Sequence, residues 1–242
     1  MEIKTSIPTV VEFLDDRFYK KGDDYYPSVT TILEVYPKGP AFTQWLKDVG
    51  NQAKAIAERA AESGSKVHNA IEMIVSGREI EWDDKIYNEQ EWCGIGGFID
   101  FYENFVDKIH ASEMNVFCDE FRYAGTLDFI CQIQDENWLI DFKFGNAVYP
   151  TYFLQIAAYR YAVQGKIQID RMGVLHLKAA TRGRDKSGKN IQGVKWKLIP
   201  PDKPYEHLFN IFKSVLLIYG EENPEAKPKN RIYPSKYKIE KR

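Results

Sequence analysis

The stretch from Gly125 to Gly145, GTLDFICQIQDENWLIDFKFG, decides the fold of this chain. It holds two runs rich in β-branched and aromatic residues, separated by the polar segment Gln134–Asn137, and this pattern predicts a β-hairpin. Asp128 lies in the first expected strand, and Asp141 and Lys143 lie two apart in the second. Side chains alternate between the faces of a strand, so Asp141 and Lys143 share a face, and hairpin pairing makes Asp128 a cross-strand neighbour of Asp141.

Charged residues are unfavourable in such apolar strands, so their presence indicates a chemical function. Two carboxylates side by side in a half-buried sheet are costly unless a cation offsets their repulsion, and hard oxygen ligands favour Mg²⁺ or Mn²⁺. Phosphodiester hydrolysis needs a metal, a positioned water and a cation near the developing charge. Asp128, Asp141 and Lys143 are therefore the candidate catalytic residues. The alternative from the residues alone is an ordinary strand-edge ion pair between Asp141 and Lys143, with Asp128 in a turn.

Outside this stretch, helical and strand-like patterns alternate along the chain. The remaining expected elements are, in order, short strands around a polar turn at 21–24, helices at 41–77 and 87–109, a strand at 115–123, a helix at 151–165, strands at 171–181 and 194–200 flanking a polar hairpin, and a helix at 204–220. The order helix, three strands, helix, strand predicts an α/β fold with an antiparallel meander and a crossover helix.

Length and composition agree with one globular domain spanning residues 1–242. We expect an opening segment and helix at 1–60, a catalytic core at 64–180, a hairpin and C-terminal helix at 181–220, and a basic tail at 221–242. The net charge of −2 does not by itself indicate a polyanionic partner. It does not exclude one, because the negative charges of a metal site and the positive charges of a surrounding groove would cancel in the net charge.

The chain carries neither a signal-peptide pattern at its start nor an apolar run of the roughly 20 residues that span a bilayer. We therefore expect a cytoplasmic protein, of a bacterial or phage-infected cell, with no membrane partner. Cys93, Cys118 and Cys131 are odd in number and widely spaced, which argues against a disulfide scaffold and against a zinc site built on a CxxC pair.

Three motifs in fixed order resemble the PD-(D/E)XK nuclease superfamily, in particular its RecB-like branch. They are Gly125–Asp128 on one strand, Ile140–Lys143 on the next, and Gln155–Tyr159 on the helix that follows. Ser65–Glu72 is similar to the upstream helix that carries a metal-binding histidine in that branch. Tyr26–Leu33 is similar to the opening segment of the mitochondrial genome maintenance exonuclease group and its phage and bacterial relatives.

The resemblance implies an αβββαβ core, with a mixed central sheet flanked by helices, and a site for Mg²⁺ or Mn²⁺. In that site His68, Asp128 and Asp141 bind the metal, with the Phe142 carbonyl as a further ligand, and Lys143 orients or activates the attacking water. The residue alone favours a capping or core histidine, and it is the match to the family helix that favours a metal ligand.

Other positions are expected to support this site. Glu72 follows His68 by one helical turn and so faces the same way. Glu120 matches an acidic position of the family; it would assist the metal through water, or simply pair with Arg122 or a lysine. The resemblance gives Gln155 and Tyr159 a role in holding the active-site strands and contacting the DNA backbone, the alternative being helix packing.

Basic residues cluster at 178–186 and in the tail, and Arg182 and Arg184 are the candidate phosphate contacts, with a solvated loop as the alternative. The acidic pairs Asp15–Asp16 and Asp83–Asp84 read as solvated turns. Some RecB-like nucleases hold an iron–sulfur cluster through four cysteines, and the three cysteines of this chain do not supply that set, so we expect no cluster.

These features favour a DNA exonuclease, acting on single strands or duplex ends in replication, repair or recombination and leaving 5′-phosphate and 3′-hydroxyl products. Its partners would be DNA and proteins of recombination or replication. The alternatives are a structure-specific or restriction-type endonuclease, and a catalytically inactive DNA-binding module of the same fold. The motifs do not distinguish attack at DNA ends from attack within a strand.

Overall fold

A computed structural model of the chain describes residues 10–13, 16–177, 183–184, 187, 190–191 and 196–224. Its elements are, in chain order, β1 (Val10–Phe13), β2 (Asp16–Lys21), β3 (Asp24–Pro27), α1 (Val29–Leu33), α2 (Pro40–Val49), a 3₁₀ turn η1 (Gly50–Gln52), α3 (Ala53–Val75), α4 (Glu89–Phe105), β4 (Lys108–Cys118), β5 (Tyr123–Ile133), β6 (Glu136–Lys143), α5 (Pro150–Val163), β7 (Arg171–His176), β8 (Gly183–Arg184), β9 (Asn190–Ile191), β10 (Lys197–Ile199) and α6 (Tyr205–Glu222).

The centre of the fold is a five-stranded mixed sheet in the order β10-β7-β6-β5-β4. Only the β6–β7 pair of this sheet is parallel, and α5 is the crossover that joins those two strands. The β5–β6 hairpin turns through Gln134 and Asp135, both with positive φ, as a two-residue hairpin loop requires. The predicted α/β order of helix, meander, crossover helix and strand is confirmed.

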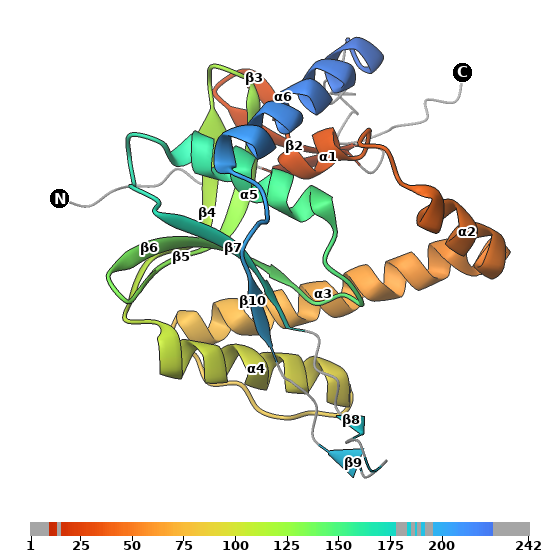
Figure 1. Cartoon of the computed structure of the whole chain (residues 1–242), viewed down its shortest axis with the longest axis vertical. Coiled ribbons are helices and arrows are strands. Elements are labelled where there is room, and N and C mark those ends of the chain that lie inside the picture. The colour runs from red at the N-terminus through yellow and green to blue at the C-terminus, as the bar shows by residue number, and fades with distance from the viewer. Residues whose placement is uncertain are drawn as a thin grey trace, which may run out of the picture.

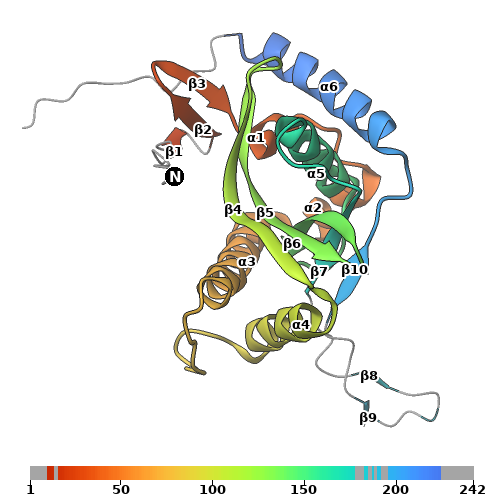
Figure 2. The same cartoon turned by 90° about the vertical axis from the view of Figure 1, so that its left-hand side faces the viewer.

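Helices cover both faces of this sheet (Figure 1), and the side view shows the resulting layers (Figure 2). One apolar cluster packs the sheet against α1, α5 and α6, and the other packs it against α3 and α4. Strand alternation divides residues between the clusters: in β7, Val174 belongs to the first and Leu175 to the second. A sheet buried on both faces explains why its strands read as nearly continuous apolar runs.

The junction between α4 and β4 differs from the sequence prediction. The helix expected at 87–109 ends at Phe105, and the strand expected at 115–123 begins at Lys108 and ends at Cys118. Both differences come from the long antiparallel pairing of β4 with β5, which shifts register between Ile109 and Ala111. Pairing with a distant strand overrides a local helical pattern when it buries apolar side chains.

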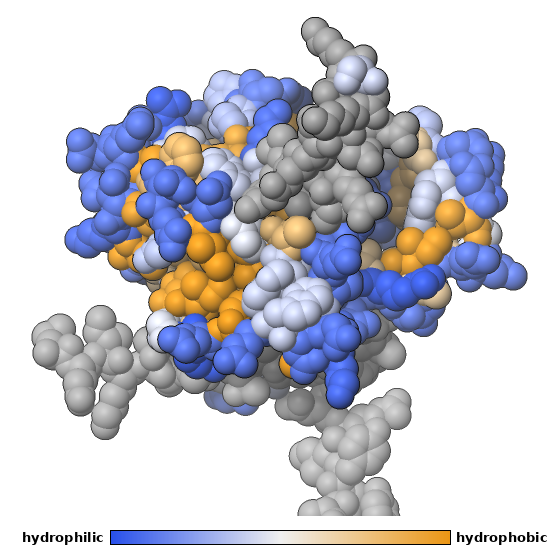
Figure 3. Space-filling view, turned by 90° about the horizontal axis from the view of Figure 1, so that it is seen from below, coloured by the Kyte–Doolittle hydropathy of each residue, from blue (hydrophilic) through white to orange (hydrophobic). Residues whose placement is uncertain are grey.

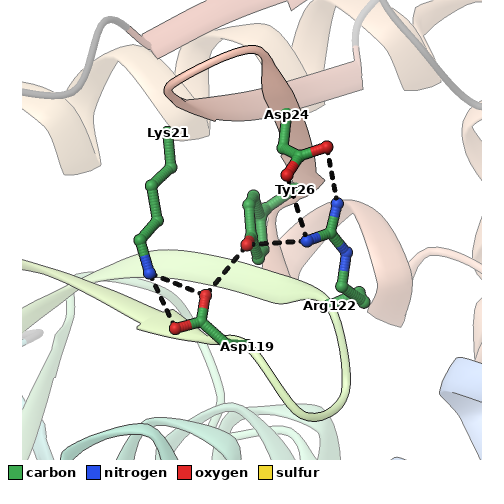
Figure 4. A network of polar contacts seen from close by, with 5 residues as sticks. All are labelled: Lys21, Asp24, Tyr26, Asp119 and Arg122. Carbon is green, nitrogen blue, oxygen red and sulfur yellow. Dashed lines mark hydrogen bonds and ion pairs between the residues drawn. The ribbon is translucent and has the colours of Figure 1, made fainter.

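A network of polar contacts fastens the β2–β3 hairpin to the turn between β4 and β5 (Figure 4). Asp119 accepts hydrogen bonds from Lys21 Nζ at 2.7 Å and from the Tyr26 hydroxyl at 2.9 Å. Arg122 donates to the Tyr26 hydroxyl at 2.8 Å and pairs with Asp24. Exposed ion pairs each contribute at most about 1 kcal/mol, so the network fixes geometry more than it adds stability.

The α2 helix projects away from the body, together with the first half of α3 (Figure 1). None of the α2 residues is buried, and Phe42 and Leu46 are 38% and 40% exposed. Apolar side chains are consequently exposed on the surface at this end of the molecule (Figure 3). In α3 the buried residues are confined to the second half, at Val67, Ala70 and Ile71. Among the described residues, no helix is both long and apolar enough to cross a membrane.

Candidate metal centre

Three acidic residues lie in register on three neighbouring strands of the central sheet. The pairs on either side of Glu113 place it opposite Asp128 across β4 and β5. The β5–β6 pairing ends with Phe129 opposite Ile140, and the next residues on the two strands are Asp128 and Asp141. Glu113, Asp128 and Asp141 therefore form a row across β4, β5 and β6.

Asp128 is anchored where the pairing of β5 with β6 stops. Its Oδ2 accepts a hydrogen bond from the backbone N–H of Phe142 at 2.6 Å, so a side chain replaces the ladder partner that β5 no longer offers. The residue is 8% exposed, and burial raises the pKa of its carboxyl group. The charge of Lys143 and the Phe142 hydrogen bond act in the opposite direction. The backbone of β6 thus fixes the direction in which this carboxylate points.

His68 reaches the same place from α3. Its Nε2 lies 3.0 Å from the Phe142 carbonyl oxygen, which can only accept a hydrogen bond, so Nε2 carries the proton. Burial and the charge of Lys143 lower the pKa of His68 to about 4, so the ring is neutral at pH 7. Its Nδ1 then presents a lone pair toward Asp128 Oδ2, 3.8 Å away. A carbonyl that orients a histidine from behind is the arrangement common to metal-binding imidazoles.

Glu113 is the site residue that sequence reasoning missed. It has a positive φ of 47°, a strained conformation for a residue other than glycine. One ligand atom each from His68, Glu113 and Asp128 lie within 4.8 Å of one another. Burial, reinforced by the charges of Asp128, Glu72 and Asp141, raises the pKa of Glu113 to about 8.

No local signal marks Glu113, because the run around it also contains the polar residues Lys108, His110, Ser112 and Asn115. Its register against Asp128 depends on the length of the 119–122 turn and on the irregularity in β4, neither of which a local pattern reports.

Asp141 and Lys143 form the other half of the centre. Asp141 is 1% exposed, and its Oδ2 lies 2.8 Å from the Lys143 ammonium. The contact is a close ion pair, and Oδ1 of Asp141 has no hydrogen-bond partner among the described residues. Burial raises the pKa of Asp141 to about 6, although Lys143 opposes the rise. Burial disfavours the Lys143 ammonium, but Asp141 and Asp128 outweigh this effect and raise its pKa.

This donor set fits a hard divalent cation. Burying three carboxylates together is costly without a positive charge, and Lys143 supplies only one. Oδ1 of Asp141, which has no hydrogen-bond partner among the described residues, and the Nδ1 lone pair of His68 are groups to which a cation could bind. Carboxylate oxygens with one imidazole suit Mg²⁺ or Mn²⁺. The Phe142 carbonyl already accepts from His68, but it has a second lone pair, so its role as a ligand stays a prediction.

Two supporting acids from the sequence prediction have different positions. Glu72 is exposed on α3, and its charge acts on Glu113, but it is not one of the three residues whose ligand atoms cluster. Glu120 does not lie on a strand: it lies in the turn between β4 and β5, where it accepts a hydrogen bond from the Tyr161 hydroxyl at 2.6 Å. The expected strand position of Glu120 is therefore wrong, its role toward the metal stays a prediction, and Glu113 is the acidic residue of that region in the cluster of ligand atoms.

Gln155 and Tyr159 are packing residues in this structure. They are 7% and 3% exposed, and Gln155 Nε2 donates to the Tyr159 hydroxyl at 3.2 Å. The Tyr159 ring lies against Gly125, where any Cβ atom would overlap it. Glycine in the Gly125–Asp128 motif thus makes room for the tyrosine of α5. Burial leaves little of either side chain for the expected contact with the DNA backbone, which stays a prediction, and the packing of Tyr159 on Gly125 is consistent with the expected role in holding the active-site strands.

The predicted basic positions lie wholly or partly outside the described residues. Arg182 lies outside the described residues, as does the chain from 225 onward, and of Arg184 the structure describes its place in β8 but not its side chain. Cys118 and Cys131 belong to different apolar clusters, and Cys93 lies on α4. A cavity of about 540 Å³ near Arg160 and Tyr205 shares no residue with the metal centre, so the assignment of the centre depends on its donor groups.

No protein-family model matches this chain, and no curated protein sequence matches it.

Proposed function

We propose that this chain is a metal-dependent DNA nuclease of the PD-(D/E)XK superfamily, RecB-like in its site, that hydrolyses phosphodiester bonds. The observation that carries the proposal is the convergence of His68, Glu113 and Asp128 within 4.8 Å, with the buried Asp141–Lys143 pair on the adjoining strand. The mixed sheet with a crossover helix is compatible with that superfamily.

Each residue would have a distinct task. His68, Glu113, Asp128 and Asp141 would hold Mg²⁺ or Mn²⁺. When bound, the ion supplies Lewis acidity toward a phosphoryl oxygen and lowers the pKa of a water molecule. Lys143 donates hydrogen bonds from an ammonium that Asp141 already orients, to the attacking water or to a phosphate oxygen on which charge develops. Tyr159 and Gly125 would keep the strands in register for this chemistry.

The test combines hydrolysis with metal binding. Purified full-length protein should degrade end-labelled linear DNA when Mn²⁺ or Mg²⁺ is added, and Asp128→Asn and Lys143→Ala should each lower the rate by at least about a hundredfold, the scale on which loss of one catalytic donor acts. Mn²⁺ calorimetry should show binding that Asp128→Asn abolishes. Asp84→Asn, the same chemical change at an exposed residue, should leave both readouts at the wild-type level.

The outcomes separate the alternatives. If neither single- nor double-stranded DNA is degraded with either ion, and Lys143→Ala behaves as wild type, the nuclease proposal is lost. Mn²⁺ and DNA binding without hydrolysis would identify an inactive DNA-binding module. Comparing linear, nicked and circular substrates labelled at either end then distinguishes an exonuclease from an endonuclease, and a defined banding pattern on plasmid DNA would indicate a restriction-type enzyme.

A further inference from the structure

The ammonium of Lys143 is held between two groups. On one side Asp141 Oδ2 lies 2.8 Å from Nζ, and on the other the centroid of the Tyr152 ring lies 4.9 Å from it. The Lys143 side chain is only 20% exposed, so solvent competes weakly for the charge. A cation over the face of an aromatic ring is attracted by the ring quadrupole, more strongly where it is desolvated.

The position of Tyr152 is set by its own part of the fold. It lies near the start of α5, which follows the loop after Lys143, and His176 holds that loop by a contact of 2.7 Å from Nε2 to the Gly145 carbonyl oxygen. Further along α5, Tyr159 packs against Gly125 of β5. Both contacts fix the helix, so the ring of Tyr152 is presented to Lys143 by a rigid element.

Lysine needs such a constraint because its stem is long and flexible. Asp141 alone leaves the ammonium free to swing about one contact, and a metal ion would draw the same carboxylate away from it. A ring face attracts the ammonium without competing for the cation, because it offers no oxygen ligand from that side.

We propose that Tyr152 is a positioning residue that holds the Lys143 ammonium in the metal centre through the face of its ring. Its catalytic consequence rests on the proposed nuclease function, but the contact itself does not. Two measurements therefore test it separately, both on full-length protein.

The first measurement is the NMR shift of the Lys143 Cε protons, assigned with Lys143→Arg. Ring currents from Tyr152 should move these signals upfield in the wild type and in Tyr152→Phe, and Tyr152→Leu should return them to the position of an ordinary lysine. Tyr149→Leu removes a neighbouring ring that meets Tyr152 edge-on, and it should keep the upfield shift. An unshifted Lys143 signal in the wild type, or an unchanged upfield shift in Tyr152→Leu, overturns the proposal.

The second measurement is kinetic. Tyr152→Leu should lower kcat about tenfold, which corresponds to about 1.4 kcal/mol and lies between the values for exposed and for desolvated cation–π contacts, while KM and Mn²⁺ affinity stay within about twofold. Tyr152→Phe should retain wild-type kcat because it keeps the ring face. Loss of Mn²⁺ binding in Tyr152→Leu, or equal damage in Tyr152→Phe, overturns the positioning role. A wild-type protein without nuclease activity would contradict the proposed function. The NMR measurement would still show whether the Tyr152 ring lies over the Lys143 side chain.

Discussion

The surroundings of Glu113 and Asp141 favour the protonated form of each carboxyl group over the ionised form. Both are drawn into the interior beside other acids, and the pKa of Glu113 rises to about 8 and that of Asp141 to about 6. Such values cost the metal-free protein stability at neutral pH, because on folding each group must either keep a proton that the unfolded chain releases or carry a buried charge beside other acids. They are the expected state of ligands arranged for a cation.

This cost makes the stability of the metal-free protein depend on pH. A pKa raised on folding adds stability below the ordinary value of the group, and that stability is lost as pH rises through the folded value. In EDTA the midpoint temperature of thermal unfolding should therefore decrease as the pH rises from about 4.5 to about 8. Glu113→Gln should flatten this fall and leave the metal-free variant more stable than wild type at pH 8, as thermal unfolding at pH 5 and pH 8 will show.

The matched control is Glu103→Gln, at an exposed position of α4, which should follow the wild-type pH profile. Adding Mn²⁺ at pH 8 should raise the unfolding midpoint of the wild-type protein, and it should raise that of Glu113→Gln much less. Parallel profiles for wild type and Glu113→Gln would contradict the burial of this carboxylate among like charges.

At the scale of elements, the contact of α5 with β5 links packing to the metal centre. Tyr159 fills the space above Gly125, three residues before Asp128 on the same strand. The same helix presents Tyr152 to Lys143. One glycine thus controls how closely the helix approaches β5, the strand that carries Asp128.

Gly125→Ala should lower the free energy of unfolding by about 1–3 kcal/mol, because the added Cβ overlaps the Tyr159 ring and overpacks the core. Chemical denaturation measures this cost, and in a Tyr159→Leu background the same change should cost clearly less, since the two residues share one contact. Gly96→Ala is the control: nothing lies within 4 Å of an added Cβ there, and the helix should tolerate or welcome it. Equal costs in both backgrounds would show that the two sites are independent.

At the scale of the whole molecule, stability and exposure are distributed unevenly. The two clusters around the sheet contain large, fully buried side chains such as Phe98 and Phe212, whereas α2 buries none of its residues. Helix α2 and the first half of α3 project from this body (Figure 1).

The double change Phe42→Ser, Leu46→Ser should therefore alter the free energy of unfolding by no more than about 0.5 kcal/mol, as exposed positions do. Phe98→Ala, at a fully buried position, should cost about 3–5 kcal/mol. Denaturant titration of both variants measures the contrast. A loss above about 1 kcal/mol for the α2 variant would mean that this helix packs against the body in solution.

Part of this architecture could be predicted from short patterns. The β5–β6 hairpin follows from two apolar runs and a two-residue turn, and the shared face of Asp141 and Lys143 follows from strand alternation. The helix containing His68 follows from its apolar spacing, and its end follows from Gly77, which has a φ of 79°. These features depend on residues within a few positions of one another, where backbone geometry has few choices.

The sequence by itself determined the α/β order, the hairpin and the candidate residues Asp128, Asp141 and Lys143, because alternation and turn length act locally. Only the tertiary structure decided that Glu113, rather than Glu120, joins the centre, that Gln155 and Tyr159 are buried, and that Tyr152 covers Lys143. Those outcomes depend on the register between β4 and β5 and on the seating of α5 on the sheet, and both are set by contacts between residues far apart in the chain.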